Sequence, residues 1–236
     1  MKLLLVRHTP KFIESLIPRM IPLGIELYTA ETREEIEEWL ASEENNSVFF
    51  NINSGDDVWI DYIKELKDRD TEKNIKIAVY LPKNNYEFLR KLYKTGITTF
   101  IYQSDIPDHI ITQMLSIVHY LEQEGERRGH IRIPLSSDDG VTIRFKYRQK
   151  EYNCNVILLS PVALSFTPTY EEFFVEIEKK EIITDIELNI RGEKATTDAI
   201  VARTDTTVAL MFVNIKDQFL NCLCSFIFSK LNEKPK

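Results

Sequence analysis

Cysteine is scarce in this 236-residue sequence, which contains only Cys154, Cys222 and Cys224. An odd number of cysteines without a Cys-x-x-Cys pair argues against a disulfide framework and indicates reduced thiols, so we expect a cytoplasmic protein. The four histidines are scattered along the chain and form no cluster with metal-ligand spacing. We therefore expect no metal site and no cofactor.

Long apolar runs and an excess of positive charge are also absent. No stretch of about 18 uncharged apolar residues exists, so the sequence predicts no membrane span. Arg7 interrupts the apolar residues 1–6 too early for the core of a signal peptide. The formal net charge of −7 argues against a nucleic acid polymer as a partner.

The charge is unevenly distributed along the chain. Residues 1–125 contain 14 basic and 21 acidic side chains, whereas residues 126–236 contain 16 of each. Within the second part, residues 126–153 contain seven basic and four acidic side chains. A local basic patch in an acidic protein suggests a small anionic ligand more than a polymer.

The first half of the chain alternates between strand and helix patterns. Strands are expected at residues 3–6, 25–28, 47–52, 75–81 and 98–102, and helices at residues 10–23, 32–41, 58–68, 84–94 and 108–124. Thr32 and Glu35 have the spacing of a helix capping box. Five such βα units predict an α/β doubly wound parallel five-stranded sheet, which places its functional groups at the carboxyl ends of the strands.

The pattern changes near Gly125, where helical spacing disappears. Short alternating runs occur at residues 141–147, 153–159, 173–178, 186–190, 195–203 and 208–213. They predict an antiparallel β-barrel or sandwich of six or seven strands. Residues 217–231 then predict a C-terminal helix whose broad apolar face plugs or flanks the barrel, or else forms a partner surface.

The first strand ends in Arg7-His8, which is how histidine phosphatases begin. That chemistry needs a nucleophilic imidazole, a second histidine and further arginines around the phosphate. A downstream strand that ends in His-Gly is missing, as is the second arginine motif. We therefore expect no catalytic residue, and interpret Arg7 and His8 as the end of the strand.

The first half resembles a response-regulator receiver domain in the number and order of its βα units. The phosphoacceptor position of that family falls at Asn51, which has no carboxylate oxygen for an acyl phosphate. Other functional positions of the family also carry different residues here. Arg7 and His8 stand where the family has its magnesium-binding acids. Tyr80 or Leu81 stands at the position of the hydroxyl residue, and Gln103 at the position of the lysine. The resemblance implies a degenerate, non-phosphorylatable domain that serves in docking or pairing.

The second half resembles a PilZ domain, the bacterial receptor module for cyclic di-GMP. The stretch ERRGHIRIPL supplies the family's Arg-x-x-x-Arg pattern as Arg128 and Arg132, preceded by Arg127. The stretch DAIVARTDTTVALMFVNI looks like the closing hairpin of the family. Arginine can fork onto phosphate oxygens or the O6/N7 edge of guanine, and it can stack on a base. The resemblance implies that these arginines bind cyclic di-GMP.

The second PilZ motif, Asp/Asn-x-Ser-x-x-Gly, aligns with Leu158-Leu-Ser-Pro-Val-Ala163. Only Ser160 of this motif is retained, and the resemblance implies that it contributes to ligand binding. Leu158 replaces the residue that holds a guanine edge, and Ala163 replaces the glycine that permits close backbone approach.

These patterns predict a receiver-like domain at residues 1–123, an arginine-rich linker at 124–134 and a PilZ-like barrel with its C-terminal helix at 135–236. The predicted function is a non-enzymatic bacterial cyclic di-GMP receptor and adapter. The alternative is a ligand-independent protein–protein adapter in which both domains have lost their ancestral chemistry. Either function implies an unidentified protein partner or a homodimer.

Overall fold

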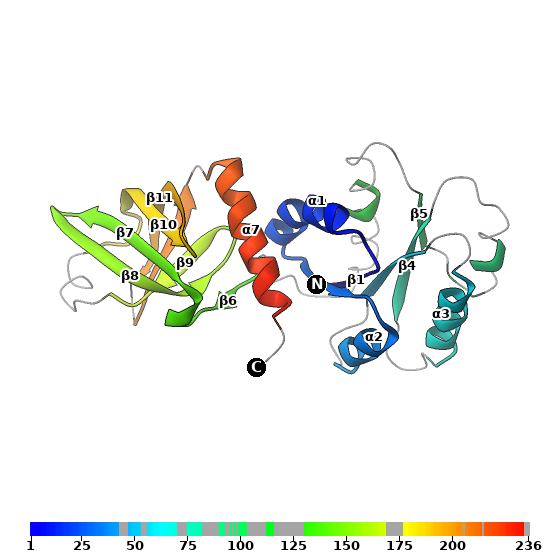
Figure 1. Cartoon of the computed structure of the whole chain (residues 1–236). Helices are drawn as coiled ribbons and strands as arrows, with labels where there is room; N and C mark the ends of the chain where they lie inside the picture. Colours follow the sequence, from blue (N-terminus) through cyan, green and yellow to red (C-terminus); the bar gives the residue numbers. More distant parts are fainter. Residues whose placement is uncertain are drawn as a thin grey trace. The chain divides into compact units, whose positions relative to one another are not determined.

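The structure is a computed structural model of the whole chain (Figure 1). It describes residues 1–42, 47–52, 56–69, 75–81, 90–92, 95, 97, 99–102, 112–115, 130–168, 177–204, 206–213 and 215–233. The chain folds into two compact units, residues 1–20 with 25–127 and residues 21–24 with 128–236.

The first unit contains a five-stranded sheet in which every pair of neighbours is parallel. Its strands are β1 (Lys2–Val6), β2 (Glu26–Ala30), β3 (Ser47–Asn51), β4 (Lys76–Leu81) and β5 (Thr99–Tyr102). Their spatial order is β2-β1-β3-β4-β5, so the order reverses between β1 and β3. This order is typical of flavodoxin-like doubly wound folds, and the predicted fold class of the first half is confirmed.

Buried apolar side chains explain why this sheet is parallel. Leu3–Val6 of β1 and Val48–Phe50 of β3 are almost inaccessible to solvent along their whole length. Strands that are buried on both faces have near-continuous apolar sequences instead of alternating ones. The helices described in this unit cover the sheet, and their apolar residues complete the core.

The helices of the first half of the chain follow the predicted positions with one correction. The expected helix at residues 10–23 is divided into α1 (Pro10–Met20), which contains Pro18, and the 3-10 helix η1 (Ile21–Leu23). Helix α2 (Arg33–Leu40) has the capping box of Thr32 and Glu35, as expected. Helix α3 (Asp57–Arg69) follows β3. The expected helices at 84–94 and 108–124 lie mostly outside the described residues, which are helical at 90–92 and 112–115.

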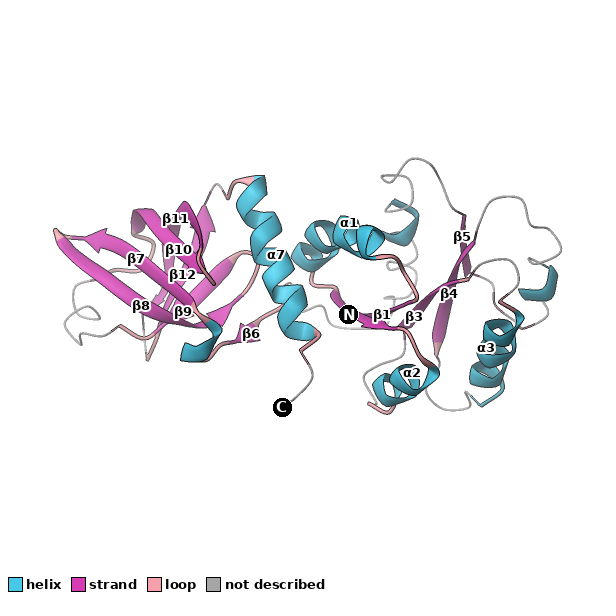
Figure 2. Ribbon diagram, in the orientation of Figure 1, coloured by secondary structure: helices cyan, strands magenta, loops and turns pink. Residues whose placement is uncertain are grey.

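The second unit contains a closed antiparallel barrel (Figure 2). Its strands are β6 (Ile133–Pro134), β7 (Val141–Tyr147), β8 (Lys150–Leu159), β9 (Ala163–Phe166), β10 (Ile182–Ile190), β11 (Glu193–Thr204) and β12 (Val208–Val213). The order β8-β7-β10-β11-β12-β9 closes through a β8–β9 pairing, and β6 adds to β8. The predicted antiparallel barrel is therefore confirmed.

Buried and exposed residues alternate along the barrel strands, and the buried residues form the core. Ile143, Phe145 and Tyr147 of β7 point inward while Arg144 and Lys146 are exposed. Phe145 stacks on Tyr152 of β8, and it meets the Phe166 ring edge-on. Strand β9, which the alternating pattern does not predict, has only four residues. The expected strand at 173–178 falls outside the described residues except for its last two, which form no strand.

The C-terminal helix α7 (Asp217–Leu231) packs its apolar face inward, as expected. The buried side chains of that face are Phe219, Leu223, Cys224, Phe226 and Ile227. At the end of the helix, Lys230 bonds to Asp139 of the 3-10 helix η2 (Ser137–Asp139) and to Glu233. These polar contacts fix the orientation of α7 on the barrel unit.

Candidate functional site

Arg132 lies immediately before β6, with its side chain exposed between the buried Ile131 and Ile133. Strand β6 is antiparallel to β8, and it pairs Ile133 with Leu159 and Pro134 with Leu158. One residue further in the same register, Arg132 comes opposite Ser160. The short strand therefore brings one arginine of the linker to the remnant of the second motif.

Ser160 is 5% exposed and organises the turn between β8 and β9. Its hydroxyl oxygen Oγ donates to the carbonyl oxygen of Ala163 at 2.9 Å and accepts from the Ala163 N–H at 2.9 Å. The Val162 N–H also points to this oxygen, at 3.4 Å. A hydroxyl has one donor and two acceptor sites, so the turn uses all of them. In this geometry Ser160 positions the turn.

The surface beside Arg132 is largely apolar. Pro134 is exposed, and Leu158 and Ala163 are partly exposed. Opposite residues of antiparallel strands project to the same face. Pro134 of β6 and Leu158 of β8 are therefore neighbours. Met211 of β12 is likewise the neighbour of Ala163 of β9. This surface therefore places the Arg132 guanidinium next to apolar side chains.

The other two arginines of the predicted site, Arg127 and Arg128, lie outside the described residues. Within the described residues, the Arg132 side chain forms neither an ion pair nor a hydrogen bond. The Arg132 side chain is exposed at this surface.

Arg144, Lys146 and Arg148 occupy alternate positions of β7 and the β7–β8 turn. The Arg144 guanidinium donates to Glu151 of β8 at 2.6 Å. Arg148 lies in the β7–β8 turn with a φ of 45°, and its guanidinium stacks over the Tyr147 ring at 5.3 Å. Acidic and aromatic neighbours thus engage both arginines within the barrel itself.

The carboxyl end of β1 is the place where the receiver resemblance locates its metal-binding acids. Here the Arg7 guanidinium pairs with Asp56 at 2.9 Å and lies over the Trp59 ring at 5.3 Å. The side-chain amide of Asn51 donates to the Arg7 carbonyl oxygen at 2.8 Å. A cation that is already paired occupies this edge, and Asn51 is held as a structural hydrogen-bond donor.

His8 is a core residue, only 4% exposed. Its ring stacks between Phe12 and Phe49, at centroid distances of 4.7 and 4.6 Å, and its Nε2 atom lies 3.2 Å from the Phe49 carbonyl oxygen. Burial lowers the pKa of His8 to about 3, against a smaller opposing effect of the Phe49 carbonyl. The imidazole is packed within an aromatic cluster that also contains Tyr80.

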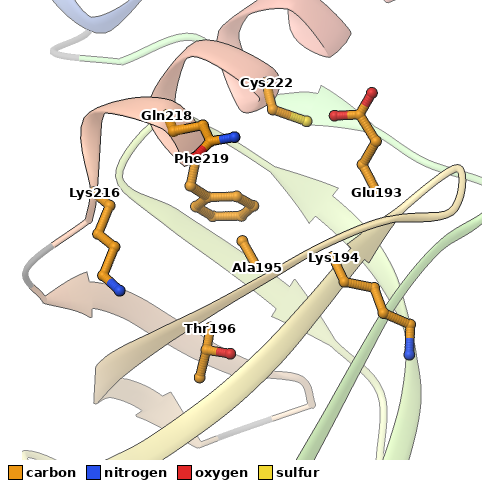
Figure 3. Close-up of a pocket in the computed structure, with 8 residues that line it drawn as sticks. All are labelled: Glu193, Lys194, Ala195, Thr196, Lys216, Gln218, Phe219 and Cys222. Atoms are coloured by element: carbon orange, nitrogen blue, oxygen red, sulfur yellow. The ribbon is translucent and has the colours of Figure 1, made fainter.

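A cavity that the sequence did not indicate lies between the start of α7 and β11. It has a volume of about 300 Å³ and is lined by Glu193, Lys194, Ala195, Thr196, Lys216, Gln218, Phe219 and Cys222. Figure 3 shows the Phe219 ring above Ala195, with Cys222 and Glu193 facing each other at one end. Burial, and then the Glu193 carboxylate, raise the pKa of the Cys222 thiol to about 12. This thiol therefore stays protonated and is a poor nucleophile.

Two kinds of site are absent from the part of the chain that the structure describes. It contains no group of three or more His, Cys, Asp or Glu side chains that could hold a metal ion. Within the same ranges, no helix has the length and apolar character needed to cross a membrane.

Comparisons with known proteins connect the chain to solved structures only. No family model matches the sequence, and no curated protein matches it either. The PilZ domain of YcgR from Escherichia coli with c-di-GMP is 17% identical with a TM-score of 0.39, over 44% of this chain and 91% of that one. The K. pneumonia MrkH–c-di-GMP complex is 13% identical with a TM-score of 0.38, over 44% of this chain and 52% of that one.

A third similar structure is the Bacillus subtilis inhibitor of motility, MotI/DgrA. It is 12% identical with a TM-score of 0.37, and the match covers 44% of this chain and 51% of that one. The matched part of this chain thus spans about half the length of MrkH and of the motility inhibitor.

Proposed function

We propose that this chain is a non-enzymatic bacterial signalling protein of the cytoplasm that binds cyclic di-GMP and acts as an adapter. The observation that carries the proposal is the position of Arg132, exposed at the start of β6 and opposite the Ser160 turn in the β6–β8 register. Arg132 is the second arginine of the Arg-x-x-x-Arg pattern, and Ser160 is the retained residue of the second motif. The two are 28 positions apart in the sequence and follow or precede strands that pair with each other.

In this proposal Arg128 and Arg132 clamp the ligand and Arg127 assists. Cyclic di-GMP carries two phosphates and two guanines, and the planar guanidinium fork matches both phosphate oxygens and the guanine O6/N7 edge. Ser160 contributes by holding the turn against which the ligand rests, through its bonds to Ala163. Binding of the ligand at the predicted linker, residues 124–134, would be the signal that the adapter transmits.

The first unit acts in this proposal as a receiver-like scaffold, residues 1–123, that is not regulated by phosphorylation. The pairing of Arg7 with Asp56 supports this role, because it puts a neutralised cation where a receiver would bind magnesium. Asn51 supports it as well, since its amide donates to the Arg7 carbonyl oxygen and provides no nucleophile. A protein partner or a second copy of the chain would dock on this unit.

Isothermal titration of the full chain with cyclic di-GMP tests the proposal. Wild-type protein should release or absorb heat on binding, and the Arg128→Ala/Arg132→Ala double variant should lose at least about tenfold in affinity. Arg144→Ala is the matched control, because Arg144 is an exposed arginine of the same barrel whose guanidinium is paired with Glu151. Its affinity should equal that of the wild type.

The second candidate is a protein–protein adapter that needs no nucleotide. The apolar side chains beside Arg132, namely Pro134 and Leu158, favour it, since they fit a partner surface as well as a ligand base. In that case titration at millimolar cyclic di-GMP would give no binding heat, while sedimentation would show self-association or a bound partner.

A further inference from the structure

The cavity between the start of α7 and β11 has groups of opposite charge at its two ends. Figure 3 shows Lys216 at one end, where α7 begins, and Glu193 beside Cys222 at the other. The Phe219 ring and Ala195 lie between the two ends. Lys216 and Cys222 are joined by one continuous helix, along which a span of this length rises by about 9 Å. A ligand that reaches both ends is therefore elongated.

The charged groups at the two ends are accessible to a ligand. The Lys216 and Glu193 side chains are both exposed. The Cys222 thiol is hydrogen-bonded to the Glu193 carboxylate, but a carboxylate has two oxygens and accepts several hydrogen bonds. Lys194, the other lysine that lines the cavity, donates to Glu187 at 2.8 Å. Lys216 is thus the cation that this cavity presents to a ligand at one end, and Glu193 is the anion at the other.

The middle of the cavity is apolar. The Phe219 side chain is only 6% exposed, and Ala195 is partly exposed. Methylene groups gain free energy when they leave water for a surface of this kind. The cavity volume of about 300 Å³ is at the lower end of the range for small-molecule sites, so it suits a short chain.

A tight hairpin holds Glu193 in place. Arg191 and Gly192 form the β10–β11 turn with φ values of 51° and 95°, and the Gly192 N–H donates to the Asn189 side-chain oxygen at 2.8 Å. The Arg191 guanidinium pairs with Glu233 at 3.0 Å. Groups that are fixed before binding lose less conformational entropy when the ligand arrives, so the acidic end of the cavity is preorganised.

We propose that this cavity binds a linear ω-amino acid, with the carboxylate at Lys216, the ammonium group at Glu193 and the methylene chain against Phe219. An ammonium group donates up to three hydrogen bonds and a carboxylate accepts them, so each end of the ligand meets a complementary group. An α-amino acid carries both charges at one end of the molecule and satisfies only one end of the cavity. This site is additional to the proposed function and shares none of its residues.

Titration of the full chain with ε-aminocaproate, followed by ligand-observed NMR, tests the proposal. Norleucine is an isomer of this probe with both charges at one end, hexanoate lacks the ammonium group, and hexylamine lacks the carboxylate. The dissociation constant of ε-aminocaproate should be at least about tenfold lower than that of each of these three controls. A smaller difference for any of them, or no saturation by ε-aminocaproate at about 10 mM, would overturn the proposal and leave cyclic di-GMP binding untouched.

Two variants locate the ligand in the cavity. Lys216→Met removes the partner of the carboxylate, and Glu193→Gln removes the charge that attracts the ammonium group. Each should weaken ε-aminocaproate binding by at least about tenfold. Lys146→Met, which changes an exposed lysine of β7, is the matched control and should bind as the wild type does. Wild-type affinity in a folded Lys216→Met or Glu193→Gln variant would place the ligand elsewhere and overturn the proposal.

Discussion

Lys230 of α7 donates a hydrogen bond of 2.7 Å to Asp139 of η2, and so joins residues that are 91 positions apart in the sequence. Both side chains are largely buried, with exposures of 17% and 12%. Asp139 also accepts a hydrogen bond from the Ser136 N–H at 2.8 Å. Lys230 also contacts Glu233. Glu233 in turn pairs with Arg191 of the β10–β11 turn. This network attaches the end of the helix to two loops of the barrel.

Replacing Lys230 with methionine should therefore destabilise the barrel unit. The change leaves the Asp139 carboxylate without its ammonium partner, and an uncompensated polar group of this kind costs about 1–3 kcal/mol. Urea denaturation monitored by circular dichroism measures the loss. Lys216→Met, at the exposed start of the same helix, is the control and should change the free energy of unfolding by less than about 0.5 kcal/mol.

The same pair predicts how stability depends on pH. The hydrogen bond from Lys230, followed by the bond from the Ser136 backbone, lowers the pKa of Asp139 below its ordinary value of 3.8. Asp139 thus contributes stability above pH 3.8 that is lost as the pH falls through its folded pKa. The pKa of Lys230 is raised by Asp139 and then Glu233, so its contribution holds at neutral pH and is lost at strongly alkaline pH. A Lys230→Met variant whose stability fell as steeply with acid as that of the wild type would contradict this assignment.

His8 predicts a second acid-sensitive process, in the first unit. Its folded pKa of about 3 lies below the ordinary value of 6.5, so the unfolded state binds more protons between these values. Stability should fall as the pH decreases below 6.5, by up to roughly 5 kcal/mol at about 1.4 kcal/mol per pKa unit. His8→Gln, which does not titrate, should remove this component from the stability-versus-pH curve. An unchanged curve would contradict the buried neutral imidazole.

Asn51 provides a prediction about the lost phosphoacceptor. Asn51→Asp restores the carboxylate that a receiver needs, but it removes the N–H that donates to the Arg7 carbonyl oxygen at 2.8 Å. We expect a loss of stability of about 1–3 kcal/mol at neutral pH and no uptake of phosphate from acetyl phosphate. Phosphate-affinity electrophoresis measures the second outcome. A phosphorylated, fully stable Asn51→Asp variant would show that the receiver chemistry is retained.

Ser160→Ala separates the support of the turn from ligand contact. Because the hydroxyl bonds to the Ala163 carbonyl and amide, its removal should reduce stability by about 1–2 kcal/mol. Arg132→Ala should leave the melting temperature unchanged, since the exposed Arg132 side chain supports no described contact. Thermal melts of the two variants check this contrast, and equal melting temperatures would contradict it.

Local periodicity was sufficient to predict the architecture. Parallel strands such as β3 are continuously apolar, antiparallel strands such as β7 alternate, and the capping box at Thr32 and Glu35 defines a helix start. Strand β9 has four residues that are buried or partly buried throughout, so its sequence contains no alternation to detect. The bulge in β8 near Leu158 also resets which side chains face outward.

Long-range contacts determined what the sequence could not predict at the site. The meeting of Arg132 with the Ser160 turn depends on a two-residue strand, which is too short for any pattern. The pairing of Arg144 with Glu151 depends on the β7–β8 register, which the sequence alone does not reveal. The burial of His8 depends on stacking with Phe49, 41 residues away.

The most direct measurement of the central claim is isothermal titration of cyclic di-GMP into wild-type protein and into the Arg128→Ala/Arg132→Ala variant. The account predicts saturable binding to the wild type and an affinity at least about tenfold weaker for the variant. Equal binding by both proteins, with the variant folded, would contradict the arginine clamp, and the absence of binding to the wild type would favour the ligand-independent adapter.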